Sequence, residues 1–373
     1  MIYLDNGATS FHKPPSVYRA VKQAMSSCAN PGRGGYAAAE NADRAVFHCR
    51  MAASSFFQCE PEQVIFTSNC THSLNIAIRT IVKPGDTVAV SGFEHNAVIR
   101  PLHALGANIK IAGRKLFDVA DTLTDFENVL KSGVDAAVFT HVSNVFGYVL
   151  PVKEMAELCR QYGVPFVIDA AQSAGMLPVS LKDLQADFIA MPGHKSLLGP
   201  QGTGILLCGH PLPSPILYGG TGSASMSTQM PDMLPDRLEA GTLNVPGIAG
   251  LAAGIKYLQD GKRAIFCRRA QRETLRCVHG LQKLGVDVFA GDSQLATVSF
   301  LPGEDCEEFA AKLAKAGVAV RGGLHCAPLA HDSAGTLNTG AVRVSFGHDA
   351  NEKQTCDFLK ITAKIMNRTK IFS

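Results

Sequence analysis

The amino-acid sequence predicts an α/β protein with a large domain on a mainly parallel seven-stranded sheet and a smaller α+β domain. The first observation behind this prediction is that short apolar runs alternate with longer helix-length segments between residues 64 and 207. The second is that most runs have four or five consecutive apolar residues, as expected for strands that helices cover on both faces. The third is the length of 373 residues, which exceeds the roughly 250 residues of a large single domain.

The predicted strands of the large domain share this apolar character. They are residues 64–67, 87–90, 109–112, 136–140, 166–169, 187–191 and 204–207. The segments between them have the length and pattern of helices, and the clearest are residues 71–82, 97–105, 124–131 and 152–162. Strand–helix alternation of this kind produces parallel strands with helices on both faces of the sheet.

The pattern changes after residue 207. Residues 209–244 are rich in Gly, Pro, Ser and Thr and predict an extended loop region near the active site. A helical tract follows at 247–284 and is interrupted near Asp260-Gly261, where we expect the boundary between the domains. The small domain is predicted to contain strands at 286–289, 296–301, 318–321 and 341–346, and helices at 304–316 and 351–366.

Composition and charge exclude several classes of protein. The net charge is only +3 and no Lys/Arg run stands out, so we expect neither nucleic acid nor a membrane surface as a partner. No apolar run reaches the roughly 18 residues of a membrane span, and the first residues do not resemble a signal peptide. The 11 cysteines include no Cys-x-x-Cys pair, which indicates reduced thiols without a metal and a cytoplasmic location.

Two polar residues follow neighbouring predicted strands. Asp169 ends the run 166–169, and Lys195 comes shortly after the run 187–191. In an open parallel sheet, ligands bind outside the carboxyl ends of the strands, so both side chains are expected at the same edge. Pyridoxal phosphate (PLP) needs such a pair, a lysine for its aldehyde and a carboxylate for its pyridine nitrogen. From spacing alone, an ordinary salt bridge at the strand ends is the commoner explanation.

Other strand ends also carry polar groups that suit a cofactor. Hydroxyl residues at 68–73 begin a predicted helix and can form an anion site, although a plain N-cap explains them equally well. His95 can stack on a flat ring, although a single loop histidine is more often incidental. Residues 140–144 form a further hydrogen-bonding cluster. Four strand ends with suitable groups, taken together, favour a cofactor site.

The small domain adds a candidate nucleophile. Cys326 ends the glycine-containing stretch Arg321-Gly-Gly-Leu-His-Cys326, and positive charge on Arg321 and His325 favours the reactive thiolate. Arg343 is a candidate for binding a substrate carboxylate through paired hydrogen bonds. An inert cysteine and a solvated strand-end arginine are the alternatives.

These motifs, in this order, resemble those of class V aminotransferase-fold enzymes, specifically the group II cysteine desulfurase and selenocysteine lyase family. The resemblance covers nearly the whole chain, from Tyr3-Leu4-Asp5-Asn6 to Arg343-Val344-Ser345. Its most specific blocks are Thr140-His-Val-Ser-Asn144, Asp169-Ala-Ala-Gln172, Gly193-His-Lys195, Glu239-Ala-Gly-Thr242 and Arg321-Gly-Gly-Leu-His-Cys326. It implies PLP-dependent transferase fold type I, with a large PLP-binding domain at 15–260 and a small domain formed by 1–14 and 261–373.

The resemblance implies roles at the cofactor. Lys195 resembles the lysine that holds PLP as a Schiff base, Asp169 the partner of the pyridine nitrogen, and His95 the ring-stacking residue that assists proton transfer. Gln172 resembles the group that binds the phenolic oxygen. Thr71, the backbone at His72 and His194 resemble the residues that bind the phosphate, and the remaining implied contacts with the cofactor are Asn144 and Thr242. Relatives donate the last of these across a dimer interface, so a homodimer is implied.

The resemblance also implies a reaction. Arg343, with Asn144, resembles the anchor of the substrate carboxylate, and Cys326 resembles the cysteine that takes the substrate sulfur as a persulfide. L-Cysteine would become L-alanine, and the persulfide would pass to an acceptor thiol, so a sulfur-acceptor protein is an expected partner. Three residues depart from the family pattern: Pro192 where a phosphate-binding Ser is common, His72 where an acidic residue is common, and Leu324 in place of the first His of Gly-His-His-Cys.

Alternatives stay open at this point. L-Selenocysteine is the other candidate substrate, and transamination, epimerisation or β-elimination are other reactions on the same fold. A low-activity scaffold protein is a further alternative. A nicotinamide dehydrogenase is disfavoured, because the glycines at 199–204 precede a strand and no Gly-x-Gly-x-x-Gly follows one.

Overall fold

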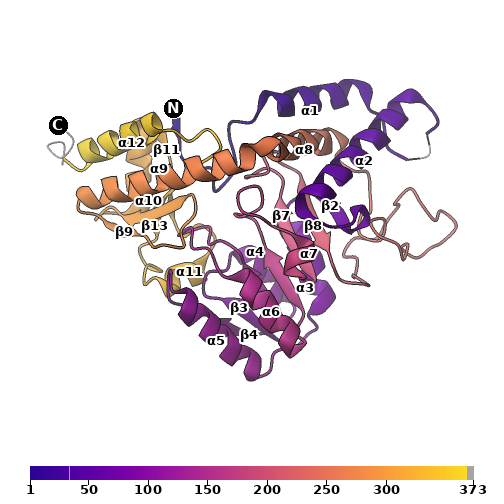
Figure 1. Cartoon of the computed structure of the whole chain (residues 1–373), viewed down its shortest axis with the longest axis horizontal. Coiled ribbons are helices and arrows are strands. Elements are labelled where there is room, and N and C mark those ends of the chain that lie inside the picture. Colours follow the sequence, from indigo (N-terminus) through magenta and orange to yellow (C-terminus); the bar gives the residue numbers. More distant parts are fainter. Residues whose placement is uncertain (33, 368–373) are drawn as a thin grey trace.

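The centre of the protein is a seven-stranded sheet, seen in a computed structural model that describes residues 1–32 and 34–367 (Figure 1). The strand order is β2-β8-β7-β6-β5-β3-β4. Only β8 runs antiparallel to its neighbours β7 and β2, and the other pairs are parallel. The strands are β2 (Val64–Thr67), β3 (Thr87–Ser91), β4 (Asn108–Ala112), β5 (Ala136–Thr140), β6 (Phe166–Asp169), β7 (Phe188–Pro192) and β8 (Gly204–Cys208). The predicted mainly parallel sheet is confirmed.

Helices cover both faces of this sheet. Alternate residues of a strand point to opposite faces, so Val88 packs with α3 and α4 on one face and Ala89 packs in the larger cluster with α5 and α6 on the other. Helices α1 and α2 lie against α8 beside the sheet (Figure 1). The bounds are α1 (Pro15–Ser27), α2 (Ala37–Phe57), α3 (Cys70–Ile81), α4 (Asn96–Ala104), α5 (Val119–Lys131), α6 (Val152–Tyr162) and α7 (Leu181–Leu184).

Side-chain caps explain where several helices begin. The Asn69 side chain accepts a hydrogen bond from the N–H of His72 and starts α3. The helix predicted at 124–131 begins five residues earlier, because Asp118 accepts from the N–H of Asp121 and caps α5. An aspartate at this position satisfies a backbone donor that would otherwise lack a partner, and the shorter prediction overlooked that signal.

The helical tract predicted at 247–284 is interrupted where expected. Helix α8 (Val245–Tyr257) and helix α9 (Arg263–Lys283) are joined by a π-helical turn at Leu258–Lys262. In this turn Asp260 leaves the helical conformation, and Gly261 adopts φ +78°. Glycine reaches this left-handed region without a steric penalty, so it allows the chain to change direction here.

The C-terminal third forms two smaller sheets. A four-stranded antiparallel sheet has the order β12-β13-β10-β9, and β1 pairs in parallel with β11. The strand predicted at 318–321 is therefore wrong as one unit, because 318–319 pair with the N-terminal strand and 321–323 pair with β13. The elements are β1 (Ile2–Tyr3), β9 (Asp287–Phe289), β10 (Thr297–Leu301), β11 (Val318–Ala319), β12 (Arg321–Gly323), β13 (Ala341–Ser345), α10 (Cys306–Lys315), α11 (Pro328–Ser333) and α12 (Glu352–Ile365).

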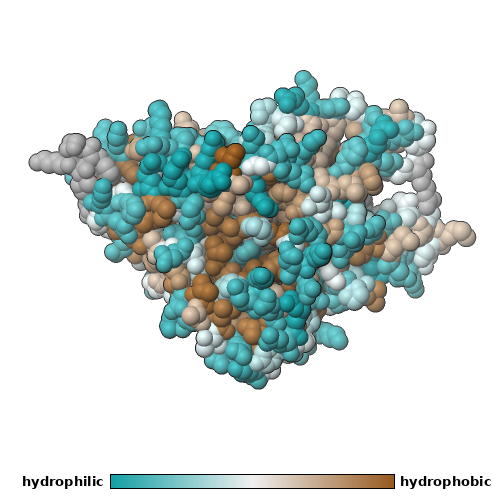
Figure 2. All heavy atoms as spheres, in the orientation of Figure 1, coloured by the Kyte–Doolittle hydropathy of each residue, from teal (hydrophilic) through white to brown (hydrophobic). Residues whose placement is uncertain are grey.

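The surface is polar over the long helix α9, and a band of hydrophobic residues lies on the same face between α9 and the helices α5 and α6 (Figure 2). Among the residues that the structure describes, no helix combines the length and the apolar character that crossing a bilayer requires.

Candidate active site

Asp169 lies at the carboxyl end of β6, in register with Ala190 of the parallel neighbour β7. Its side chain is buried. The Oδ1 atom accepts hydrogen bonds from the N–H of Ala171 (2.9 Å) and the thiol of Cys70 (3.5 Å). Burial raises the pKa of the Asp169 carboxyl, and the charge of Lys195 opposes that shift. A buried carboxylate with so few donors is a group that a cationic ligand would stabilise.

Lys195 lies in the turn that follows β7, at the same edge of the sheet. Burial lowers the pKa of its amine, and the carboxylate of Asp169 acts in the opposite direction. Within the described residues, however, the Lys195 amine makes no ion pair within 4.0 Å with Asp169 and no hydrogen bond. The simple strand-end salt bridge that spacing alone favoured is therefore wrong. Each group shifts the pKa of the other through its charge, but the two side chains form no ion pair.

His95 caps the N-terminus of α4. Its Nδ1 accepts a hydrogen bond from the N–H of Ala97 (3.0 Å), which leaves the proton of the neutral ring on Nε2. Burial lowers the pKa of His95 to about 4, and the positive charges of Lys195 and Arg343 add to this shift. His95 is therefore a neutral, fixed imidazole close to both cations at neutral pH.

The N-terminal segment crosses over this edge of the sheet. The Gln172 amide donates to the carbonyl of Gly7 (3.0 Å), so in this structure it contacts the main chain. The Nδ1 of His194 lies 3.0 Å from the hydroxyl of Thr9, and the N–H of Ser10 donates to the carbonyl of His194 (3.1 Å). Burial lowers the pKa of His194 to about 4. These contacts fix the residues immediately around Lys195.

The predicted phosphate residues lie at the start of α3. The N–H of His72 is already bound to the Asn69 side chain (2.9 Å), so the expected contact through the backbone at His72 is occupied by an N-cap. The N–H groups of Cys70 and Thr71 have no partner in the described chain, and Thr71 is exposed. Thr242 is also exposed and lines a surface hollow together with Ser68 and His72.

Cys326 is exposed on a loop with unusual backbone geometry. His325 and Cys326 both have positive φ values, 53° and 56°, which residues other than glycine adopt only when their surroundings hold them. The N–H of Asn96 donates to the carbonyl of Cys326 (2.7 Å), so the loop lies directly beside His95. Pro192 and Leu324 both depart from the family pattern. Pro192 ends β7, and Leu324 directly precedes His325.

The expectation that His325 is a cation beside this thiol is wrong. Its ring stacks on His331, with ring centroids 5.6 Å apart, and both rings are buried. Burial and the nearby charge of Arg343 lower the pKa of His325 to about 3, so the ring is neutral. Of the two expected cations, Arg321 alone carries charge near Cys326.

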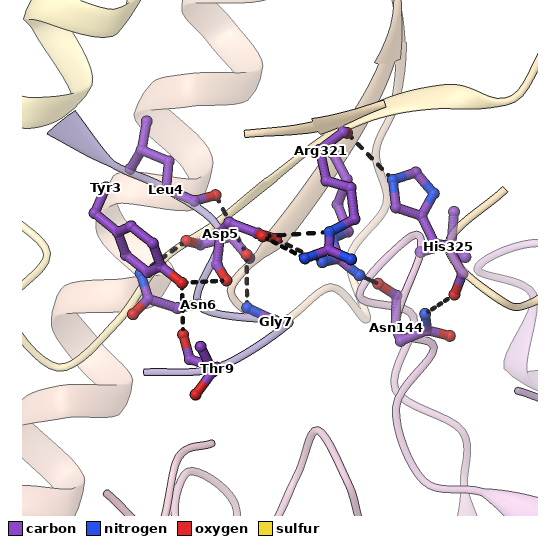
Figure 3. Close-up of polar contacts among 12 residues, drawn as sticks. Tyr3, Leu4, Asp5, Asn6, Gly7, Thr9, Asn144, Arg321 and His325 are labelled. Carbon is purple, nitrogen blue, oxygen red and sulfur yellow. Dashed lines mark hydrogen bonds and ion pairs between the residues drawn. The ribbon is translucent and has the colours of Figure 1, made fainter. Parts of the chain in front are cut away.

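Arg343 on β13 lies in the interior between the sheets. Its Nη2 donates to Oδ1 of Asp5 (2.8 Å) and its Nη1 to the carbonyl of Asn144 (3.0 Å). Its buried Nε has no partner in the part of the chain that the structure describes. The Asn144 amide in turn donates to the carbonyl of His325 (2.9 Å), which connects the arginine to the loop of Cys326 (Figure 3).

Three residues in or beside the site did not emerge from sequence reasoning. Asp5 entered only as part of the resemblance, and Cys70 was not connected with Asp169. Glu94 is fully buried, accepts from the N–H of Thr140 (2.8 Å), and has its pKa raised to about 8 by burial. A glutamate directly before the predicted ring-stacking histidine, at the end of an apolar strand, is the signal that would have marked it.

Comparisons with known proteins find relatives along nearly the whole chain. Residues 2–358 match the family described as aminotransferase class-V. A probable cysteine desulfurase of Pyrococcus abyssi is 31% identical over 345 residues, which cover 88% of this chain and 85% of the relative. A cysteine desulfurase of Haloferax volcanii is 30% identical over 93% of this chain and 85% of its own. The solved apo structure of a cysteine desulfurase from Thermococcus onnurineus aligns with a TM-score of 0.90 at 30% identity, covering 98% and 94% of the two chains.

Proposed function

The chain belongs to the aminotransferase class-V family, and on this basis we propose that it is a PLP-dependent cysteine desulfurase that converts L-cysteine to L-alanine. The observation that carries the proposal is that the loop of Cys326 lies at the same sheet edge as Asp169 and Lys195. Asp169 is buried there and Lys195 is half-buried, and these two described residues form no ion pair with each other. The loop of Cys326 is hydrogen-bonded to the residue that follows His95.

The residues present fit PLP. Among the described residues, Oδ2 of Asp169 and the amine of Lys195 both lack hydrogen-bond partners, as expected if a pyridinium N–H and an aldehyde are their partners. The free N–H groups at the start of α3 suit a phosphate. We infer that Gln172, Asn144, Thr71, His194 and Thr242 complete these contacts. When bound, PLP withdraws electrons from the substrate α-carbon.

Lys195 and His95 supply the proton transfers in this proposal. The lowered pKa of Lys195 increases the share of neutral amine, which is the form that can accept a proton from the substrate α-carbon. His95 is neutral and holds its proton on Nε2, so it can donate there and accept again. Its N-cap contact fixes the direction in which that proton points.

Cys326 receives the sulfur. Its thiolate attacks the substrate sulfur, so that a new S–S bond forms as the carbon–sulfur bond of the substrate breaks. The electron pair of the broken bond stays with the substrate carbon, which takes up a proton and becomes the methyl group of L-alanine. The sulfur remains as a persulfide on Cys326 and passes to an acceptor thiol by exchange. In this proposal the guanidinium of Arg343 holds the substrate carboxylate.

L-Selenocysteine is the second candidate substrate, because selenide can leave without a persulfide carrier. We propose to measure alanine, sulfide and selenide from both amino acids for the wild type, for Cys326→Ala and for the control Cys28→Ala. Cys326→Ala is expected to lose alanine formation from cysteine, whereas Cys28→Ala keeps it. Full activity of Cys326→Ala on cysteine would refute the persulfide mechanism, and activity confined to selenocysteine would favour a lyase.

The proposal also covers the oligomeric state, the domain division, the location and the partner of the protein. A homodimer is expected, since exposed Thr242 and the hollow that it lines suit a contribution from a partner subunit. We divide the chain into a large domain at 15–260 and a small domain at 1–14 and 261–373, which the pairing of β1 with β11 supports. The eleven unpaired cysteines suit a reducing compartment such as the cytoplasm, and a sulfur-acceptor protein is the expected partner.

A further inference from the structure

Five residues close a ring of polar contacts, which we call the polar ring: Asp5, Arg321, His325, Asn144 and Arg343, of which the first four are labelled in Figure 3. The guanidinium of Arg321 donates to Oδ2 of Asp5 (2.9 Å), and the Nε2 of His325 donates to the carbonyl of Arg321 (3.2 Å). The Asn144 amide donates to the carbonyl of His325 (2.9 Å). Arg343 then donates to the carbonyl of Asn144 (3.0 Å) and to Oδ1 of Asp5 (2.8 Å), which completes the ring.

Asp5 is the one acidic group in this ring, and each of its carboxylate oxygens serves a different arginine. The Arg343 side chain is 3% exposed and that of Asp5 is 13% exposed, whereas Arg321 is 52% exposed. Two guanidinium groups and one carboxylate leave a net charge of +1. The ring can therefore attract one further carboxylate, whereas the Nε of Arg343 is itself buried and has no partner among the described residues.

The segment that carries Asp5 is itself fixed. The Tyr3 hydroxyl donates to the carbonyl of Thr9 (2.9 Å), and the N–H of Gly7 donates to the Ser345 hydroxyl (2.7 Å). A Cβ atom at Gly7 would lie 3.3 Å from the central carbon of the Arg343 guanidinium, so the backbone packs directly against the arginine. The segment around Asp5 is consequently held by contacts with Thr9 and Ser345 in addition to those with the two arginines.

We propose that Asp5 is a positioning residue that ties the carboxylate anchor Arg343 to the loop of Cys326. This inference rests on the proposed function. A substrate held by its carboxylate at Arg343 must present its sulfur to Cys326, so the spacing between anchor and loop decides the rate, and small displacements of reacting groups are costly. Asp5 sets that spacing, because the same carboxylate fixes Arg343 and the residue at which the loop begins.

The loop needs such support because its backbone is strained. His325 and Cys326 both adopt left-handed conformations that persist only where the surroundings impose them. The polar ring supplies this restraint on one side through Arg321 and Asn144, and the N–H of Asn96 supplies it on the other. Loss of Asp5 or of the Arg321 side chain weakens this restraint, because Arg321, whose carbonyl accepts from His325, is then no longer held by Asp5.

The test compares Arg321→Gln and Asp5→Asn with Asp332→Asn in the PLP-loaded full-length protein. Asp332 forms an exposed ion pair with Arg114 just beyond the loop, outside the polar ring. Arg321→Gln removes the contact between Asp5 and the residue at which the loop begins and leaves Arg343 paired, so kcat for L-cysteine is expected to fall about tenfold or more while KM stays within about twofold. Asp5→Asn is expected to lower kcat and also to raise KM. Asp332→Asn is expected to change neither constant.

A second readout does not depend on catalysis: the rate at which iodoacetamide alkylates Cys326, followed by peptide mass spectrometry without substrate. Both ring variants are expected to change this rate about threefold or more, and Asp332→Asn is expected to leave it unchanged. Wild-type rates of alkylation in both ring variants would overturn the inference, as would an equal change in Asp332→Asn. If Asp5→Asn does not fold, Arg321→Gln alone decides.

Different results would refute the proposed function and the positioning role of Asp5. Wild-type protein that forms no alanine from cysteine would refute the proposed function, and the alkylation rates would then still support or overturn the role of the polar ring. Wild-type protein that is active, with ring variants unchanged in kcat, KM and alkylation, would refute the role of Asp5 alone.

Discussion

At the carboxyl edge of the seven-stranded sheet, the acidic Asp169 and the basic Lys195 form no ion pair with each other, whereas in the polar ring Asp5 pairs with both Arg321 and Arg343. Burial disfavours the charged form of both sheet-edge groups. The groups at the sheet edge are thus free to bind a ligand, whereas most charged groups of the polar ring are already paired with one another. Removing a sheet-edge group should impair chemistry more than folding, and removing the acidic group of the ring should impair folding as well.

Lys195→Ala should have the largest effect on activity. The variant loses the amine that we assign to cofactor binding and proton transfer, so alanine formation from L-cysteine is expected to fall at least about 10³-fold. The measurement is the initial rate of alanine production at saturating cysteine. Lys182→Ala, at an exposed position before the same strand, is the control and should retain wild-type activity. Substantial activity in Lys195→Ala would break the assignment of the sheet edge.

Asp5→Asn should have the largest effect on stability. It leaves the buried guanidinium of Arg343 without its carboxylate, and breaking a buried pair from one side costs about 3–5 kcal/mol. Urea unfolding followed by circular dichroism measures the loss. Asp349→Asn, which removes the more exposed ion pair with His12, should cost at most about 1 kcal/mol. Equal losses in the two variants would contradict a special role of the ring in folding.

Acid should destabilise the sheet edge through His141. This residue follows β5, and its N–H donates to the carbonyl of Asp169. Burial lowers its pKa from 6.5 to about 4, so the unfolded chain binds the proton first as the pH falls. Stability from this group is complete above pH 6.5 and is lost as the pH falls toward 4, with a slope of up to about 1.4 kcal/mol per pH unit.

The matched variant for this prediction is His141→Gln. Its unfolding free energy should depend less steeply on pH over the same window, as measured by urea titrations at several pH values. The raised pKa of Glu94, about 8, acts in the opposite direction, because its burial penalty appears as the pH rises from 4.5 toward 8. An unchanged acid slope in His141→Gln would show that another group dominates.

Asp169→Asn should have the smallest effect on the free energy of unfolding among these variants, and its effects on stability and activity should have opposite signs. The amide oxygen of the asparagine can still accept from Ala171 and Cys70, and the buried charge disappears. The cofactor-free protein is therefore expected to gain about 1 kcal/mol of unfolding free energy while alanine formation falls. Thermal unfolding and the alanine assay measure the two quantities. A destabilised variant with full activity would reverse the comparison.

The sheet edge could be predicted from the sequence because short, continuous segments of the chain determine it. Each strand is a short apolar run, the parallel order brings neighbouring carboxyl ends together, and Asp169 and Lys195 follow such runs. The break at Asp260-Gly261 is a local signal too, since glycine tolerates the required φ.

The polar ring was not accessible in the same way. Its ion pair between Asp5 and Arg343 joins residues 338 positions apart, and neither the periodicity nor the spacing around Asp5 indicates that partner. The neutral state of His325 depends on burial against His331, which the sequence does not reveal. The division of 318–323 between two sheets likewise follows from pairing with the N-terminal strand and with β13.

The proposed reaction is tested most directly by treating the PLP-loaded protein with one equivalent of L-cysteine and mapping added sulfur by peptide mass spectrometry while counting alanine. The account predicts one added sulfur atom on the peptide that contains Cys326 for each alanine formed, and removal of that sulfur by a thiol reductant. Alanine formed without added sulfur on Cys326, or with the sulfur on one of the other ten cysteines, would contradict it.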